Sequence, residues 1–325
     1  MPTPPLDETT VVALVSAATA APSLHNAQPW RFRHHSAVRT VELRPDLSRA
    51  MPRSDPDHRA LHLGCGAALL NLRAAAAHHG LPARTVILPD PSDPRLLATV
   101  HLTGTDPPDR ELALLFPAIT RRHTSRHPFE EKALPADVQD ALREAAAQED
   151  VQLLFPDQWH VEALLDQVHD AEGRDTLEPE RLEELRRWIR AGEGSADGIP
   201  AYAFGPRSRS GRAPVRDFAG RAHLPDRPAV AFETTPNLAL LGTAGDRPAD
   251  WLRAGQALER VLLLATLHGL ATALTSHALE HADLRALARD PRSAMGFVHM
   301  VLRLGYGPAG SATPRRPVSD VLETV

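Results

Sequence analysis

The chain has 325 residues, 42% hydrophobic and 24% charged, which are ordinary proportions for a globular protein and argue against collagen-like, disordered and membrane-spanning classes. This length predicts one large or two moderate domains. A formal net charge of −5 argues against general nucleic-acid binding, although it leaves room for a local basic pocket.

The N-terminal residues 1–8 contain acid and proline where a signal peptide would have a basic run followed by an apolar core. No aliphatic stretch approaches the roughly 18 residues that a membrane span needs. Cys65 is the only cysteine, so neither an intramolecular disulfide nor a cysteine-based zinc cluster can form. We therefore expect a cytoplasmic protein with no membrane partner and no nucleic-acid partner.

The first hundred residues predict helices that alternate with strands. Pro22 ends a first helix that has one apolar face, and Gly80, in the left-handed cap position, ends a second and longer helix. In chain order we expect a helix over 7–20, a loop over 21–29, a strand over 38–43, a helix over 57–79 and strands over 85–88 and 97–102.

The second part of the chain predicts a similar series interrupted by an insertion. We expect helices over 112–120, 135–147, 159–169 and 179–191, a strand over 238–242, a helix over 250–268 and a strand over 297–304. The insertion, 192–227, is rich in Gly, Pro, Arg and Ser and offers few apolar side chains for packing. It is either a lid or a solvated linker. Its arginines would repel one another unless an anion or an acidic surface lies beneath them.

The two long helices match each other in sequence. A shift of 189 residues aligns Gly66 with Gly255 and Gly80 with Gly269, and seven of the sixteen aligned positions are identical. Two Ala/Leu helices that end in glycine match partly by composition, but this number favours an internal duplication. We expect an α+β fold with halves at 1–110 and 111–325.

Short polar side chains lie between two prolines in segment 21–32, Ala-Pro-Ser-Leu-His-Asn-Ala-Gln-Pro-Trp-Arg-Phe. The prolines stiffen this loop, and its hydroxyl, amide and backbone groups can bond the carbonyls and ring nitrogens of a flat heterocycle. The alternative is an ordinary turn that places Trp30 in the core.

The pattern Ala-Pro-Ser-x-x-Asn-x-Gln-Pro-Trp-x-Phe resembles the flavin-contacting loop of FMN-dependent nitroreductases, and the surrounding sequence is similar to the duplicated Acg-type branch of that family. Ordinary members form an intertwined dimer with FMN at the interface. The resemblance implies a nitroreductase-like fold in which one chain forms a pseudo-dimer. It covers residues from about 12 to 322.

The basic segment 121–129 is similar to the family's opening Arg-x-Ser motif. A phosphate held away from water needs directional cationic donors, which arginine provides, and a threonine hydroxyl can complete the set. Arg122, Thr124 and Arg126 are the best candidates, and the alternative is a solvated basic turn. Arg315 and Arg316 occupy the place of the family's final basic pair. Ser276 and His277 occupy the place of the segment that passes the flavin N5.

Taken together, the resemblance assigns cofactor-binding roles to thirteen residues: Pro22, Ser23, His25, Asn26, Gln28, Arg121, Arg122, Thr124, Arg126, Ser276, His277, Arg315 and Arg316. No side chain is assigned a catalytic role. The pairs His58/His62 and His277/His281 have metal-ligand spacing, but neither has the glutamate of a zincin, so we expect no metal.

The resemblance implies an FMN-dependent oxidoreductase that passes two electrons from NAD(P)H or an organic donor to a nitro, quinone or similar acceptor. Two alternatives stay open: a flavin-dependent dehydrogenase or tailoring oxidase of a secondary metabolite, and a protein that stores or sequesters FMN. The expected partner is a small-molecule substrate. The expected assembly is a monomer with pseudo-dimeric halves or a homodimer.

Overall fold

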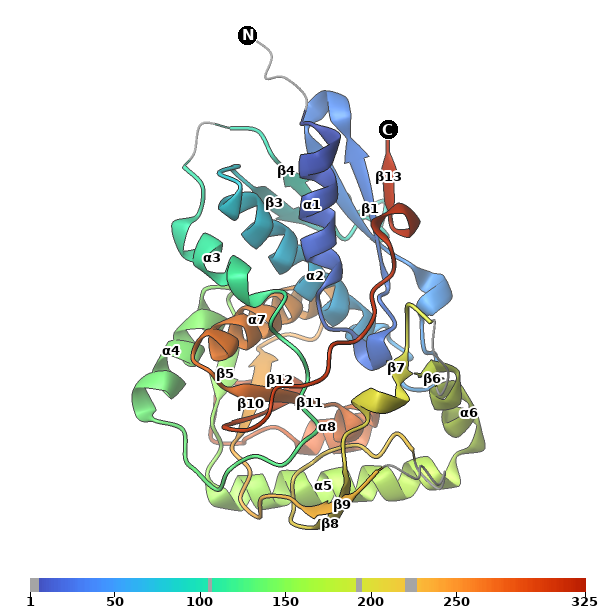
Figure 1. Ribbon diagram of the computed structural model, residues 1–325, viewed down its shortest axis with the longest axis vertical. Helices are drawn as coiled ribbons and strands as arrows, with labels where there is room; N and C mark the ends of the chain where they lie inside the picture. Colours follow the sequence, from blue (N-terminus) through green and yellow to red (C-terminus); the bar gives the residue numbers. More distant parts are fainter. Residues whose placement is uncertain (1–5, 105–106, 191–194, 220–226) are drawn as a thin grey trace.

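Two β-sheets are joined through a pair of long helices in the computed structural model, which describes residues 6–104, 107–190, 195–219 and 227–325 (Figure 1). The first half contains α1 (Glu8–Thr19), β1 (Trp30–His35), β2 (Thr40–Pro45), α2 (Arg59–His78), β3 (Arg84–Ile87) and β4 (Ala98–His101). Gly80 has a φ of 71° and ends α2 in the left-handed conformation, as its sequence position predicts.

The second half begins with α3 (Arg110–Leu115), α4 (Ala136–Ala147) and β5 (Gln152–Leu154). The inserted elements are α5 (Gln158–Leu177), α6 (Pro179–Trp188), β6 (Ile189–Arg190), β7 (Ile199–Pro200), β8 (Arg207–Ser210) and β9 (Ala229–Ala231). The chain then forms β10 (Leu238–Thr243), α7 (Pro248–Leu267), β11 (Ala271–Thr275), α8 (Ala282–Leu287), β12 (Phe297–Gly305) and β13 (Leu322–Thr324).

The same order of elements occurs twice. The series α1, β1, β2, α2, β3, β4 corresponds to α4, β5, β10, α7, β11, β12. In space the strands are ordered β1-β2-β4-β3 in one sheet and β5-β10-β12-β11 in the other, and neighbours within these sets are antiparallel. This repeated order supports the internal duplication, which stays a prediction together with its halves at 1–110 and 111–325.

The C-terminal strand crosses back to the first half. β13 pairs with β1 in parallel, with Leu322 opposite Phe32, and thereby becomes an edge of the first sheet (Figure 1). The intervening segment passes the polar loop on its way, because Asn26 Nδ2 donates to the Pro314 carbonyl at 3.1 Å. Residues near 315 are thus held beside the 22–28 loop, although they are far away in sequence.

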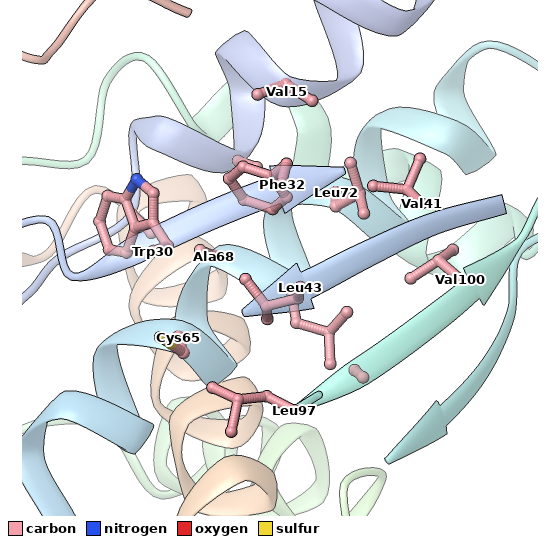
Figure 2. Packing of buried hydrophobic residues seen from close by; sticks show 14 of the residues in the cluster. Val15, Trp30, Phe32, Val41, Leu43, Cys65, Ala68, Leu72, Leu97 and Val100 are labelled. Carbon is pink, nitrogen blue, oxygen red and sulfur yellow. The ribbon is translucent and has the colours of Figure 1, made fainter. Parts of the chain in front are cut away.

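Apolar side chains from α1, α2 and the first sheet form one core. Figure 2 shows Val15 of α1, Phe32 of β1 and Leu72 of α2 within this cluster, and Trp30 is fully buried there. Of the described helices, α2 is long and apolar enough to cross a membrane, but 89% of its apolar window is buried. Its apolar side chains are therefore used for packing within the protein.

The insertion packs more than its composition predicts. Ile199, Phe204 and Phe218 are buried together in one apolar cluster. Arg212, Arg216 and Arg227 pair with the carboxylates of Asp166, Asp175 and Asp217. The acidic partners of these three arginines therefore offset the repulsion that the arginine-rich sequence predicts. Residues 192–194 and 220–226 of the insertion, including Arg221, lie outside the described residues.

Several boundaries differ from the sequence expectation for physical reasons. The helix expected over 112–120 begins at Arg110 and ends at Leu115, because Pro117 lacks the N–H of a further α-helical turn and the chain continues as a 3₁₀ turn. The helix expected over 159–169 continues to Leu177, since nothing in the polar residues after 169 breaks it. The strands β1, β5, β11 and β13, the four strands β6 to β9 of the insertion and the short helix α8 were not expected, and all of these are only two to six residues long.

Candidate functional site

A large cavity lies between the two halves. Its empty volume is about 1250 Å³, part of which is open to solvent. Both halves and the insertion line it, through the 22–26 loop, the N-terminal part of α2, segment 122–126, residues 214–218, the end of β11 and the C-terminal segment. Ten of the thirteen residues that the sequence singles out are among the lining residues: Pro22, Ser23, His25, Asn26, Arg122, Thr124, Arg126, Ser276, His277 and Arg315.

The 22–28 loop has an unusual backbone. His25, Asn26 and Gln28 have φ values of 49°, 56° and 53°, in the left-handed region that non-glycine residues seldom adopt. Hydrogen bonds hold this shape, since Ser23 Oγ accepts from the Gln28 N–H at 2.9 Å. Both donors of the Asn26 amide are used, by the Gly198 carbonyl at 3.0 Å and by Pro314, so the amide oxygen is what the side chain still offers to a ligand.

Two arginines meet at one end of the cavity. Arg122 Nη2 and Arg315 Nη2 each donate to the Ala20 carbonyl at 3.1 Å, so two guanidinium groups share one acceptor. Glu259 of α7, fully buried, places Oε1 3.4 Å from Arg122 Nε. The Nε atoms of both arginines and both Glu259 oxygens are buried without a hydrogen bond among the described residues.

Burial governs the ionisation at this end. It raises the pKa of Glu259, and the neighbouring Arg122 opposes that shift. Burial, reinforced by the charge of Arg122, lowers the pKa of Arg315 to about 10. Arg315 is still cationic near neutral pH. The result is a buried cationic pocket with unused donors, which suits a multiply charged oxyanion.

Arg126 lies apart from this pair. Its Nη1 donates to the Ala203 carbonyl at 2.9 Å and its guanidinium stacks 5.0 Å from the centre of the Phe218 ring. Burial lowers the pKa of Arg126 to about 10. The insertion thus holds Arg126, through Ala203 and Phe218.

The Ser276–Glu280 turn after β11 forms another part of the wall. Ser276 Oγ donates to Glu280 Oε1 at 2.8 Å. His277 is buried, and neither ring nitrogen has a hydrogen-bond partner among the described residues, although Nε2 lies 3.9 Å from Glu172 Oε1. Burial and the nearby Arg216 keep the pKa of His277 well below its usual range, so the ring is neutral.

Three of the predicted site residues do not line the cavity. Gln28 is fully buried and structural, because its amide donates to the Ala196 carbonyl and accepts from the Arg316 N–H at 2.8 Å. Arg316 itself pairs with Asp46 at 3.4 Å. Arg121 is exposed and does not line the cavity, whereas its neighbour Arg122 is buried and does.

The sequence did not single out several lining residues. Arg59 starts α2 and is buried against the carbonyls of His299 and Leu279, while Arg216 and Glu280 form an ion pair at 3.0 Å. Arg59 follows an ordinary-looking turn and carries no local signal. Arg216 belongs to the arginine-rich insertion, whose need for a counter-charge was the one available clue.

The comparisons with known proteins agree on a family. No protein-family model matches the chain. Rv3131 of Mycobacterium tuberculosis (strain H37Rv), provisionally named an NAD(P)H nitroreductase, is 34% identical over 328 residues, which cover 98% of this chain and 92% of that protein. Acg of the same strain, named in the same way, is 33% identical over 320 residues, covering 96% of this chain and 94% of that protein.

Among solved structures, one match is the FMN-dependent nitroreductase NfnB from Mycobacterium smegmatis in complex with NADPH. It is 17% identical, with a TM-score of 0.35, and the match covers 60% of this chain and 89% of that one. The identification rests on the mycobacterial relatives, which match nearly the whole chain at more than 30% identity. The chain belongs to the nitroreductase family that includes Acg.

Proposed function

We propose that this protein is an FMN-dependent oxidoreductase of the nitroreductase type, which moves two electrons between NAD(P)H or an organic donor and a nitro, quinone or similar acceptor. The observation that carries the proposal is the cavity, in which the loop resembling a flavin-contacting loop and the basic segment resembling a phosphate-binding motif meet. They are about a hundred residues apart in sequence. When bound, FMN supplies the hydride chemistry.

The residues present fit FMN at the cationic end of the cavity. The buried Nε atoms of Arg122 and Arg315 lack hydrogen-bond partners, and a phosphate would supply acceptors for them. Thr124 adds a hydroxyl on the same segment. Gly64 of α2 also lines the cavity, and a Cβ there would lie 3.2 Å from Ser23 Cβ. The small residue keeps the loop close to α2.

We therefore propose that FMN is bound by the cavity-lining residues to which the family resemblance assigns this role, with the exception of His25. They are Pro22, Ser23, Asn26, Arg122, Thr124, Arg126, Ser276, His277 and Arg315. One chain supplies all of them, so a monomer can form the site and a dimer is not required for it. Neutral His277 has one ring nitrogen that can donate a hydrogen bond and one that can accept, and both can serve a polar edge of the flavin ring.

A second candidate function, FMN storage, is favoured by how firmly the insertion is attached over the site. Gly198 exchanges two hydrogen bonds with Asn26, and Thr275 Oγ1 donates to the Pro214 carbonyl at 2.9 Å. Ile199, Val215 and Phe218 of the insertion line the cavity. A cover of this kind would restrict access to the flavin if it did not open.

Anaerobic addition of NADPH to the FMN-loaded protein separates the two candidates. An oxidoreductase should lose its flavin absorbance near 450 nm within about a second, which is the slow end of typical enzyme turnover at about 1–10³ s⁻¹. The absorbance near 450 nm should recover fully when a quinone is added, because the quinone reoxidises the flavin. A bound flavin that stays oxidised after NADPH is added would favour storage. Dithionite, added afterwards, should reduce the free FMN in the same cuvette and so show that the solution is anaerobic.

A further inference from the structure

His25 makes a contact that fixes its protonation. Arg216 Nη1 lies 3.4 Å from His25 Nε2 in hydrogen-bond geometry. A guanidinium group has donors only, so His25 Nε2 must be the accepting, unprotonated nitrogen. The neutral ring therefore carries its proton on Nδ1. The tautomer follows from the identity of the partner.

The proton on Nδ1 has no hydrogen-bond partner in the part of the chain that the structure describes. His25 is only 6% exposed and lines the cavity, yet Nδ1 makes no hydrogen bond to the described residues. The ring is held by its left-handed backbone and by an edge-to-face contact with Phe218, with 5.6 Å between ring centres and an angle of 84°. A positioned donor is thus available to whatever occupies the cavity.

Arg216 is itself held in place from two sides. Its Nη2 donates to Asp175 Oδ2 of α5 at 3.1 Å and to Glu280 Oε2 of the turn after β11 at 3.0 Å. Arg181 of α6 donates to both of these side chains as well. The two carboxylates and two arginines balance in formal charge, so each charged group in this buried network has a partner of opposite sign.

The surroundings favour an oxygen that carries partial negative charge. Burial and the charge of Arg216 lower the pKa of His25 to about 3, so the ring remains a neutral donor at physiological pH, while Glu280 acts in the opposite direction. Arg126, which has no carboxylate partner among the described residues, adds positive charge nearby. A preoriented donor next to a cation stabilises an oxygen on which electron density accumulates.

We propose that the His25 Nδ1–H group binds an oxygen of the electron-accepting substrate, a nitro oxygen or a quinone carbonyl, and that Arg216 is the positioning residue that fixes the donor tautomer. This assignment moves His25 from the cofactor to the acceptor. It rests on the proposed function of the site. Because Arg216 belongs to the insertion, the acceptor subsite is complete only when residues 214–218 are in place.

The first test needs neither flavin nor turnover. In the purified apoprotein labelled with ¹⁵N-histidine, two-dimensional NMR distinguishes protonated from unprotonated ring nitrogens. We expect His25 to show Nδ1–H alone in the wild type, and a shift toward Nε2–H or a mixture of tautomers in Arg216→Leu. A wild-type His25 protonated on Nε2, or a tautomer unaffected by Arg216→Leu, would overturn the assignment.

The second test measures binding of menadione, a quinone, to the oxidised FMN-loaded protein without reductant. His25→Ala should weaken menadione about tenfold, since a buried hydrogen bond contributes about 0.5–1.5 kcal/mol. His25→Asn keeps an N–H near the Nδ1 position and tolerates the left-handed backbone, so it should lose less than about threefold. His169→Asn, on the exposed surface of α5, is the matched control and should change nothing.

The FMN dissociation constant of the same variants distinguishes cofactor from substrate. We expect it to stay within about twofold of wild type. If His25→Ala weakens FMN and leaves menadione unchanged, the donor serves the flavin and the proposal is wrong. If the wild type binds no FMN, the proposed function fails instead, whatever tautomer the NMR experiment shows.

Discussion

Gly66 of α2 and Gly255 of α7 face each other where the two helices cross. A Cβ on Gly66 would lie 3.0 Å from Gly255 Cα, and a Cβ on Gly255 would lie 2.9 Å from Gly66 Cα. Each added carbon would also meet a backbone carbonyl of the opposite helix, that of Leu252 or Leu63. These are the two glycines that the 189-residue shift aligns. Equivalent residues meet each other on a twofold axis, so the contact supports the internal duplication.

Gly66→Ala should therefore destabilise the fold. The methyl group would meet backbone atoms, which cannot rotate away, so the helices must separate at a cost of about 1–3 kcal/mol or more. The free energy of unfolding in urea measures the effect. Gly173→Ala in α5 is the matched control, because nothing lies within 4 Å of its added carbon and alanine favours the helix by about 1 kcal/mol. Equal stability of Gly66→Ala and wild type would contradict the close crossing.

Arg122→Ala should weaken FMN binding, because it removes a buried donor and leaves Glu259 without its cation. Loss of one partner of a buried charged pair costs about 2–5 kcal/mol, or roughly 30-fold and upward in the dissociation constant. Fluorescence titration of FMN measures it. Arg121→Ala, the exposed neighbour, should leave the constant unchanged. Equal effects of the two variants would mean that the basic segment contributes general charge and no specific contact.

FMN binding should take up a proton at Glu259. Burial raises the pKa of this carboxyl group, Arg122 and Arg315 lower it, and Asn71 is the neutral side chain that faces it. A phosphate dianion beside Arg122 competes for the arginine and raises the pKa further. FMN binding therefore weakens as the pH rises through the pKa of Glu259. At most about one proton is taken up by the protein per FMN bound.

Titration calorimetry at pH 8 in two buffers of different ionisation heat counts these protons. At that pH the phosphate is already dianionic, since its second pKa is about 6. Glu259→Gln should abolish the uptake. Riboflavin, which lacks the phosphate, should bind the wild type without it. A proton count that is the same for wild type and Glu259→Gln would exclude Glu259 as the acceptor.

Glu280 should contribute stability that disappears in acid. Burial would raise its pKa, but Arg216 and its hydrogen bonds lower it to about 2. A lowered pKa stabilises the fold above the ordinary value of 4.5, and this contribution is lost as the pH falls from 4.5 toward 2. The difference in unfolding free energy between wild type and Glu280→Gln should thus be large at pH 7 and shrink below pH 4.5.

An exposed carboxylate serves as the control for that series. Asp140 is 73% exposed and pairs with Arg143. The difference in unfolding free energy between wild type and Asp140→Asn should therefore be near zero at every pH. A Glu280 difference that stays constant between pH 7 and pH 3 would show that the Arg216 network does not lower its pKa.

The long helices and the polar loop could be predicted from the sequence because their signals are local. Glycine caps, proline stops and apolar periodicity fix α2 and α7 to within three residues at each end. The Pro-Ser-x-x-Asn pattern identified the loop itself. Short strands such as β5 and β13 carry too few residues for a periodic signal, and they form only because a neighbouring strand is present.

The site was predictable only as far as each residue's role depends on its own segment. Arg122 was favoured over its neighbour Arg121, but their opposite burial could not be read from the sequence, because it depends on the ion pair of Arg122 with Glu259 of α7. Gln28 matched the motif but is used to hold residue 196 and Arg316. Arg216 and Glu280 could not be identified, since their ion pair joins segments 64 residues apart.

The FMN content of the purified protein tests the proposed site most directly. After reconstitution with excess FMN and removal of the unbound cofactor, the protein should be yellow and release one FMN per chain on denaturation, because the motifs of the two halves complete a single site. Arg122→Ala prepared in parallel should retain less. A folded wild-type chain that stays colourless and shows no FMN binding in titration would contradict the account.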